Sequence, residues 1–183
     1  MRAHTSRLAL LAATASLVLV SACSSAEDTA SDGEDTTTPA EGTGYTIALP
    51  EGWSDVTEEA AENQSLVDLA IAAEPVDSFR TNFNVVKPQP FAGTEDELVE
   101  QSAQELESVT NSKVTPVDAV EFDGVRALGQ TSTLAAPQGD VTLIQFMVVR
   151  DEQIHPVTMT FLAANEDDAT AVMEDIIASW QWE

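Results

Sequence analysis

Few side chains in this sequence could carry catalytic chemistry. It contains two histidines, and the first, His4, lies in the leader-like start of the chain. The second, His155, stands just before Pro156 at the start of an apolar, strand-like run. A hydrolase built on imidazole needs a nucleophile and an orienting group around that ring, and no Gly-x-Ser-x-Gly elbow is present. We therefore predict that the protein is not an enzyme.

The acidic residues form no recognisable metal motif. The best match to a calcium loop starts at Asp28, but it places Ala30 at a ligand position and Pro39 where a bidentate glutamate is needed. No zinc site is expected, because the chain has one cysteine and no His-Glu-x-x-His motif. A glycine-rich phosphate loop is also missing. The sequence thus predicts no metal and no cofactor, and acidic runs such as 166–168 are interpreted as solvated helix ends.

The single cysteine, Cys23, has a different chemistry. Arg2 and Arg7 make a basic start, and residues 8–22 form an uncharged run of 15 residues, short for a bilayer span but typical of a secretory signal. The run ends in Val20-Ser21-Ala22-Cys23, which resembles the lipobox of bacterial lipoproteins. The resemblance implies a signal peptide over 1–22 and lipidation of Cys23, whose sulfur forms a thioether to diacylglycerol and which becomes the acylated new N-terminus. Such an anchor would hold the protein at the outer face of a bacterial cytoplasmic membrane. The alternative is an ordinary signal peptide cut at the small residues, with Cys23 incidental.

Charge narrows the range of partners. The chain has 32 acidic and 7 basic residues, and loss of the leader removes Arg2 and Arg7, leaving 5 basic residues and a net charge of −27. This field repels nucleic acid and gives no attraction to anionic lipid headgroups, so the acyl anchor alone would provide membrane contact. Without a second cysteine no intrachain disulfide can form, and the fold must rest on its apolar core.

Composition divides the rest of the chain in two. Residues 24–43 consist of Ser, Thr, Asp, Glu, Ala, Gly and Pro, without an aromatic or large aliphatic side chain. Such a stretch buries too little apolar surface to offset its ordering entropy, so residues 23–43 are predicted to be a lipidated, disordered acidic tether. Twenty such residues have a reach of about 25 Å. Residues 44–183 are predicted to form a single α+β domain.

Within this domain, strand and helix patterns follow one another. Thr94 and Glu97 fit a capping box, Asn165 is expected to cap a second helix, and Asp123-Gly124 predicts a two-residue hairpin turn. The run 141–150 is apolar on both faces and belongs in the interior of a sheet. Helices are expected over 95–109 and 166–179, a short helix or loop over 55–63, and strands over 45–49, 67–73, 83–86, 114–122, 125–135, 141–150 and 154–163.

The order of these elements resembles the Mog1/PsbP-like superfamily, and within it the LpqN/LpqT-type lipoproteins of actinobacteria. The motifs that carry the resemblance are YTIALPEGW (45–53), NFNVV (82–86), GVRALG (124–129), TLIQFMVV (142–149) and IASWQW (177–182). The resemblance implies a central antiparallel sheet flanked by helices in an α/β/α sandwich. It also implies binding to partner proteins and a role linked to the cell envelope, and it brings no active-site residue.

The aromatic residues are the remaining candidates for a binding site. Trp53, Phe79 and Phe83 lie near the opening strands, and Arg80 is the basic residue nearest to them in the sequence. The ordinary role of such aromatics is packing in the core. The alternative is a groove between sheet and helix that accepts an acyl chain or a partner segment, with Arg80 binding an anionic group of the ligand.

Three functions therefore stay open. The sequence favours a membrane-anchored, non-catalytic binding or accessory module that serves cell-envelope assembly or export through a protein partner. The second function is a carrier of a lipid or another small apolar ligand in a cavity of the same fold. The third is a surface hydrolase, for which the sequence offers no catalytic constellation.

Overall fold

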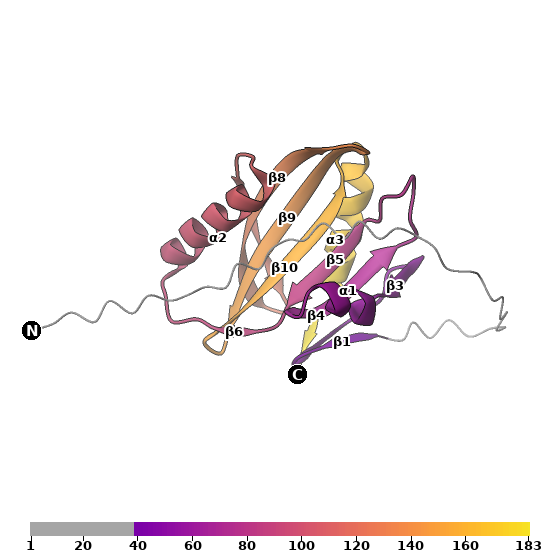
Figure 1. Ribbon diagram of the computed structural model, residues 1–183. Helices are drawn as coiled ribbons and strands as arrows, with labels where there is room; N and C mark the ends of the chain where they lie inside the picture. The colour runs from indigo at the N-terminus through magenta and orange to yellow at the C-terminus, as the bar shows by residue number, and fades with distance from the viewer. Residues whose placement is uncertain (1–38) are drawn as a thin grey trace, which may run out of the picture.

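An antiparallel sheet of eight strands forms the centre of the molecule (Figure 1). The computed structural model describes residues 39–183. The strand order is β3-β4-β5-β10-β9-β8-β7. The short strand β6 pairs with the start of β10, along the same edge as β5. The bounds of these strands are β3 Trp53–Asp55, β4 Val67–Ala73, β5 Asn82–Val86, β6 Gln89–Pro90, β7 Thr115–Phe122, β8 Val125–Ala136, β9 Gly139–Arg150 and β10 Gln153–Leu162.

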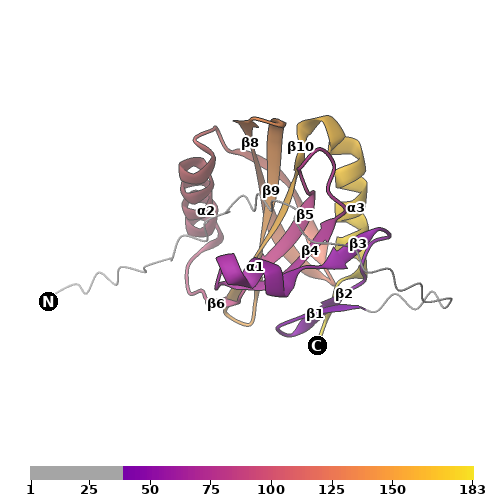
Figure 2. The ribbon, with the colours of Figure 1, turned by 45° about the vertical axis from the view of Figure 1, so that its right-hand side comes forward.

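Three α-helices cover the two faces of this sheet. The helix α3 (Glu166–Ser179) packs on one face, and α1 (Thr57–Asn63) and α2 (Glu95–Thr110) pack on the other. Figure 2 shows α2 and α3 on opposite sides of the strands. The expected α/β/α sandwich is therefore confirmed. No helix within residues 39–183 is both long and apolar enough to span a membrane.

The face under α3 carries the main core. Residues paired across adjacent strands lie on the same face of a sheet. One such row crosses four strands, from Ile71 through Phe83 and Met159 to Ile144. Met173 and Ile176 of α3 pack onto the same cluster. Because strand β9 is buried on both faces and lies between β8 and β10, the prediction of an interior strand over 141–150 is confirmed.

Local signals placed most element ends correctly. Thr94 and Glu97 form the predicted capping box of α2, and that helix ends at Asn111, which has a left-handed φ of 50°. The hairpin between β7 and β8 turns at Asp123 and Gly124, with φ values of 46° and 78°, as a two-residue turn requires. The short acidic segment before β4 is helical, as α1, rather than a loop.

The prediction for Asn165 was wrong in one respect. The helix α3 does begin at Glu166, but the Asn165 side chain forms no capping hydrogen bond. A single 3-10 turn, η1 (Ala163–Asn165), leads directly into the helix, so Asn165 has a ψ of 24° instead of the extended backbone of a capping residue. The same turn ends β10 at Leu162, one residue before the predicted end.

A second, three-stranded sheet corrects the boundary of the predicted tether. Its strands are β1 (Ala40–Gly42), β2 (Tyr45–Ile47) and β11 (Gln181–Trp182), in the order β1-β2-β11. Residues 40–42 were predicted to be disordered, yet they pair with β2, and Ala40 is buried in the main core with 4% of its surface exposed. The leader, Cys23 and the tether up to residue 38 lie outside the described residues.

Gly42 is the residue of this small sheet that tolerates no side chain. It stands opposite Tyr45, and a Cβ atom at Gly42 would overlap the Tyr45 ring. We expect Gly42→Ala to lower the free energy of unfolding by about 1–3 kcal/mol, because the buried ring would have to move. Urea denaturation of the purified protein measures this, with Glu41→Ala at the exposed neighbouring position as control. Equal stability of the two variants would contradict the packing described.

Candidate functional site

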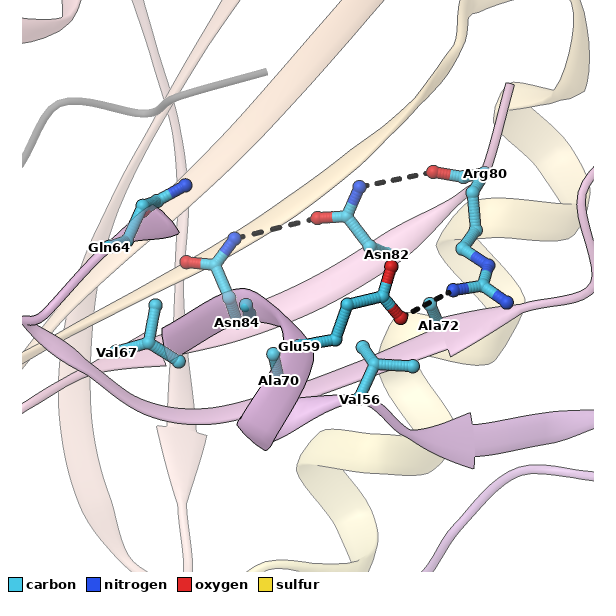
Figure 3. Close-up of a pocket in the computed structure, with 10 residues that line it drawn as sticks. Val56, Glu59, Gln64, Val67, Ala70, Ala72, Arg80, Asn82 and Asn84 are labelled. Carbon is cyan, nitrogen blue, oxygen red and sulfur yellow. Dashed lines mark hydrogen bonds and ion pairs between the residues drawn. The ribbon is translucent and has the colours of Figure 1, made fainter. Parts of the chain in front are cut away.

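A small pocket lies between α1 and the strands β4 and β5 (Figure 3). Its volume is about 40 Å³. The apolar part of its wall consists of short side chains, among them Val56, Ala60 and Ala70. The polar part is formed by Glu59, Gln64, Arg80, Asn82 and Asn84.

The polar groups of the pocket follow one another along β5 and the loop before it. Nη1 of Arg80 lies 3.5 Å from Oε2 of Glu59 on α1. The backbone carbonyl of Arg80 accepts a hydrogen bond of 3.1 Å from Nδ2 of Asn82, and Oδ1 of Asn82 accepts one of 3.5 Å from Asn84. Asn82 and Asn84 share a face because they are two residues apart on a strand. Amide side chains offer both donors and acceptors, so a group bound here would meet polar side chains along β5 and apolar ones from α1 and β4.

The row of polar side chains continues from Asn84 across the sheet. Asn84 stands opposite Thr158 on β10, which stands opposite Gln145 on β9, and Gln145 stands opposite Gln130 on β8. Nε2 of Gln130 donates a hydrogen bond of 2.8 Å to Oε1 of Gln145. The face that carries α1 and α2 therefore has a polar centre, whereas the face under α3 is apolar.

The structure does not bring the four predicted site residues together. Arg80 lines the pocket, but its charge is already paired with Glu59, and 24% and 41% of the two side chains are exposed. Phe83 points to the opposite face and is 1% exposed in the main core. Phe79 belongs to a separate cluster with Val141 and Leu143, and Trp53 packs against the main core. The alternation of the motif Asn-Phe-Asn explains this result, because a strand that buries Phe83 turns both asparagines toward the pocket.

His155 lies in an aromatic cluster on the α3 face, away from the pocket. Its ring is 5.1 Å from that of Trp182 and 6.4 Å from that of Tyr45, between ring centres, and 6% of the residue is exposed. Within residues 39–183 its Nδ1 atom has no hydrogen-bond partner. Burial lowers the pKa of His155, the charge of Asp68 opposes this shift, and the charge of Arg150 adds to it. His155 is therefore a neutral core residue at pH 7.

A second hollow, called the α2 groove here, is open and larger. It has a volume of about 510 Å³ and lies between the loop 91–93 and one flank of α2. Phe91 and Gly93 line it from the loop, and Glu97, Glu100, Gln101 and Gln104 line it from the helix. Sequence reasoning missed this site, although a signal was present: the acidic residues of α2 continue beyond its first turn. In the described part of the chain, no three His, Cys, Asp or Glu side chains are grouped as metal ligands.

Comparison with known proteins identifies the fold. No family model and no curated protein matches the sequence. Among solved structures, LpqN, involved in cell envelope biogenesis of Mycobacterium tuberculosis, has a TM-score of 0.56 and 13% identity over 80% of this chain and 85% of its own. Cyanobacterial PsbP (CyanoP) from Synechocystis has a TM-score of 0.54 and 13% identity, over 86% and 98%. The Ran-binding protein Mog1p of Saccharomyces cerevisiae has a TM-score of 0.53 and 9% identity, over 76% and 90%.

These similarities confirm the resemblance at the level of fold. The chain has the Mog1/PsbP-like fold, and a protein of the LpqN type is among the structures that share it. Identities of 13% and below carry no functional residue from those proteins to this one. The two hollows and the buried histidine are therefore interpreted from their own geometry.

The burial of His155 predicts how stability depends on pH. Unfolding exposes the ring and restores its ordinary pKa of 6.5, so below about pH 7 the unfolded chain binds a proton that the folded chain does not. Between about pH 7 and pH 5, we expect the wild type to lose melting temperature relative to His155→Phe, which cannot bind that proton. Calorimetry of both proteins at matched ionic strength measures the difference. Parallel pH profiles would show that His155 is not buried as a neutral ring.

Proposed function

We propose that this protein is a lipid-anchored module on the outer face of a bacterial cytoplasmic membrane, and that it acts by binding a protein partner in cell-envelope assembly or export. The proposal of a lipid anchor is based on Cys23 and the signal-like run before it. The envelope role is supported by the fold shared with LpqN, whose name places it in envelope biogenesis, and the binding role by the fold shared with a Ran-binding protein.

The observation that carries the proposal is the position of His155. It is the one histidine of residues 39–183, and it lies in the core on the α3 face, whereas both hollows involve the face of α1 and α2. A nucleophile in either hollow would have no imidazole base beside it. The accessible surfaces instead present amides, carboxylates and an aromatic side chain, which suit recognition of another molecule by contact.

The carrier function gains no support from the pocket beside α1. Pockets that bury small organic ligands commonly measure about 300–1,000 Å³, well above the 40 Å³ of this one. The α2 groove has a sufficient volume, but it is open to solvent and lined mainly by polar side chains, so it would not shield a hydrocarbon from water.

Removal of the anchor tests the proposal in living cells. We expect Cys23→Ser to be released into the medium or to accumulate as uncleaved precursor, because no acyl chain can be attached. We also expect it to lose the partner that the anchored wild type captures on crosslinking, because the anchor confines both proteins to one surface and raises their effective concentration. Fractionation and affinity capture of tagged full-length chains measure the two effects, with Ser24→Ala as the matched control that keeps the cysteine.

Two results would contradict the proposal. If Cys23→Ser stays on the membrane in a normally processed form, the anchor is not at Cys23. If the anchored wild type captures no envelope protein above the level of an untagged strain, the protein does not act through a stable partner.

A further inference from the structure

The stability of helix α2 explains only the acidic residues of its first turn. It carries six acidic residues and no basic one. Glu95, Asp96 and Glu97 stand in the first turn, where the helix dipole favours carboxylates, and Glu97 also completes the capping box. Glu100, Glu105 and Glu107 lie beyond that turn, and Glu100 stands four residues after Asp96, a spacing at which like charges repel. Glu100 accepts a hydrogen bond of 3.3 Å from Nε2 of Gln104, but no ion pair within residues 39–183 compensates its charge. A charge that is left uncompensated in this way is a candidate for function.

Phe91 gives the α2 groove a fixed aromatic wall. Its backbone N–H donates a hydrogen bond of 2.8 Å to the carbonyl of Glu152. Its side chain packs against the cluster of Leu98, Met147 and Ile154. The ring also lies close to Gly93, where a Cβ atom would come within 2.9 Å of it. Phe91 is therefore held at the groove by contacts on several sides and does not depend on a ligand for its position.

The carboxylates at the groove have no basic counterpart in the described part of the chain. Of the ion pairs within residues 39–183, the one that involves α2 joins Glu95 to Arg126, and it does not include a residue of the groove. A cation brought by another molecule would compensate these carboxylates.

We propose that the α2 groove is the docking surface for a segment of the partner protein that is rich in lysine or arginine. Its cations meet Glu97 and Glu100, and one of them lies over the face of the Phe91 ring, which attracts a positive charge. Gln101 and Gln104 offer donors and acceptors to the backbone of the segment. This inference rests on the proposed function, since it names the surface and the chemistry of the partner.

The strong acidity of the chain favours this occupant over others. A chain with 32 acidic and 7 basic residues repels phosphate and carboxylate ligands before they reach the groove. A second copy of the chain carries the same excess of negative charge. A cationic segment is attracted instead, and the carboxylates that repel one another along α2 are screened when it binds.

Site-specific photocrosslinking in cells that produce the full-length, anchored protein tests the proposal. The photoreactive residue replaces Gln104 in the groove, or Asp175 on the exposed side of α3 as the control position. We expect crosslinks from position 104 to a protein segment with an excess of lysine and arginine, identified by mass spectrometry. Few or no crosslinks to that segment are expected from position 175, because α3 covers the other face of the sheet.

Charge reversal at two matched positions then distinguishes binding in the α2 groove from general attraction to the acidic surface of the protein. With the photoreactive residue kept at position 104, we expect Glu100→Lys to reduce the crosslink about tenfold and Asp175→Lys to change it less than about twofold. The first variant alone replaces an attractive contact in the groove by a repulsive one. Glu100→Lys places a lysine four residues after Asp96, a spacing that favours the helix, so loss of folding does not explain the expected effect. Phe91→Leu keeps an apolar side chain and should weaken the crosslink through loss of the aromatic face.

The outcomes separate the two proposals. Crosslinks at position 104 to lipid, or to a neutral or acidic segment, would overturn the chemistry proposed for the partner. Crosslinks to an envelope protein at position 175 alone, or equal losses in the two lysine variants, would show that the α2 groove is not the docking surface. The proposal of partner binding would then stand. No crosslinked protein at either position, together with no captured partner for the anchored wild type, would overturn both.

Discussion

Repulsion among its own carboxylates is the constraint that this fold has to overcome. The chain has 32 acidic residues against 7 basic ones, and its single cysteine precludes an intrachain disulfide. The compact state therefore depends on apolar burial that outweighs the repulsion. The sheet buries one continuous apolar face under α3, while the acidic residues of 39–183, on helices, strands and turns alike, stay out of the buried core. The same excess of negative charge that opposes folding also repels anionic molecules and attracts cationic ones.

A cluster of aromatic side chains attaches the first and last strands of the domain to this core. The rings of Tyr45 and Trp180 are stacked with centres 4.0 Å apart. Trp182 donates a hydrogen bond of 2.8 Å from Nε1 to the carbonyl of Phe122, and the guanidinium of Arg150 lies 4.8 Å from the centre of its ring. Strand β1 and the C-terminus consequently lie near one another, and α2 lies at the other end of the molecule in both views (Figures 1 and 2). An anchor that leads into β1 would leave the α2 groove free to meet a partner.

The parts of the structure that could be predicted are those with local causes. The capping box at Thr94, the turn at Asp123-Gly124 and the doubly apolar strand β9 are each set by neighbouring residues. Strand β1 could not be predicted, because small and polar residues become a strand there only by pairing with β2, and β11 joins them from the far end of the chain. The ion pair of Arg80 with Glu59 depends in the same way on the packing of α1. Arg80, a candidate from the sequence, lines the pocket beside α1, whereas the asparagines beside it and the α2 groove required knowledge of which face each side chain occupies.

Recognition of a cationic partner by a strongly anionic body is the central claim, and ionic strength tests it most directly. The measurement is the crosslinking yield between the anchored protein and its partner in isolated membranes, as salt is raised from about 50 to 500 mM, a range in which the Debye length falls well below about 10 Å. Attraction between opposite charges predicts a steep, continuous loss of the complex that is reversed when salt is removed. A yield that stays constant or rises over this range would contradict the account, because apolar contact and not charge would then hold the partner.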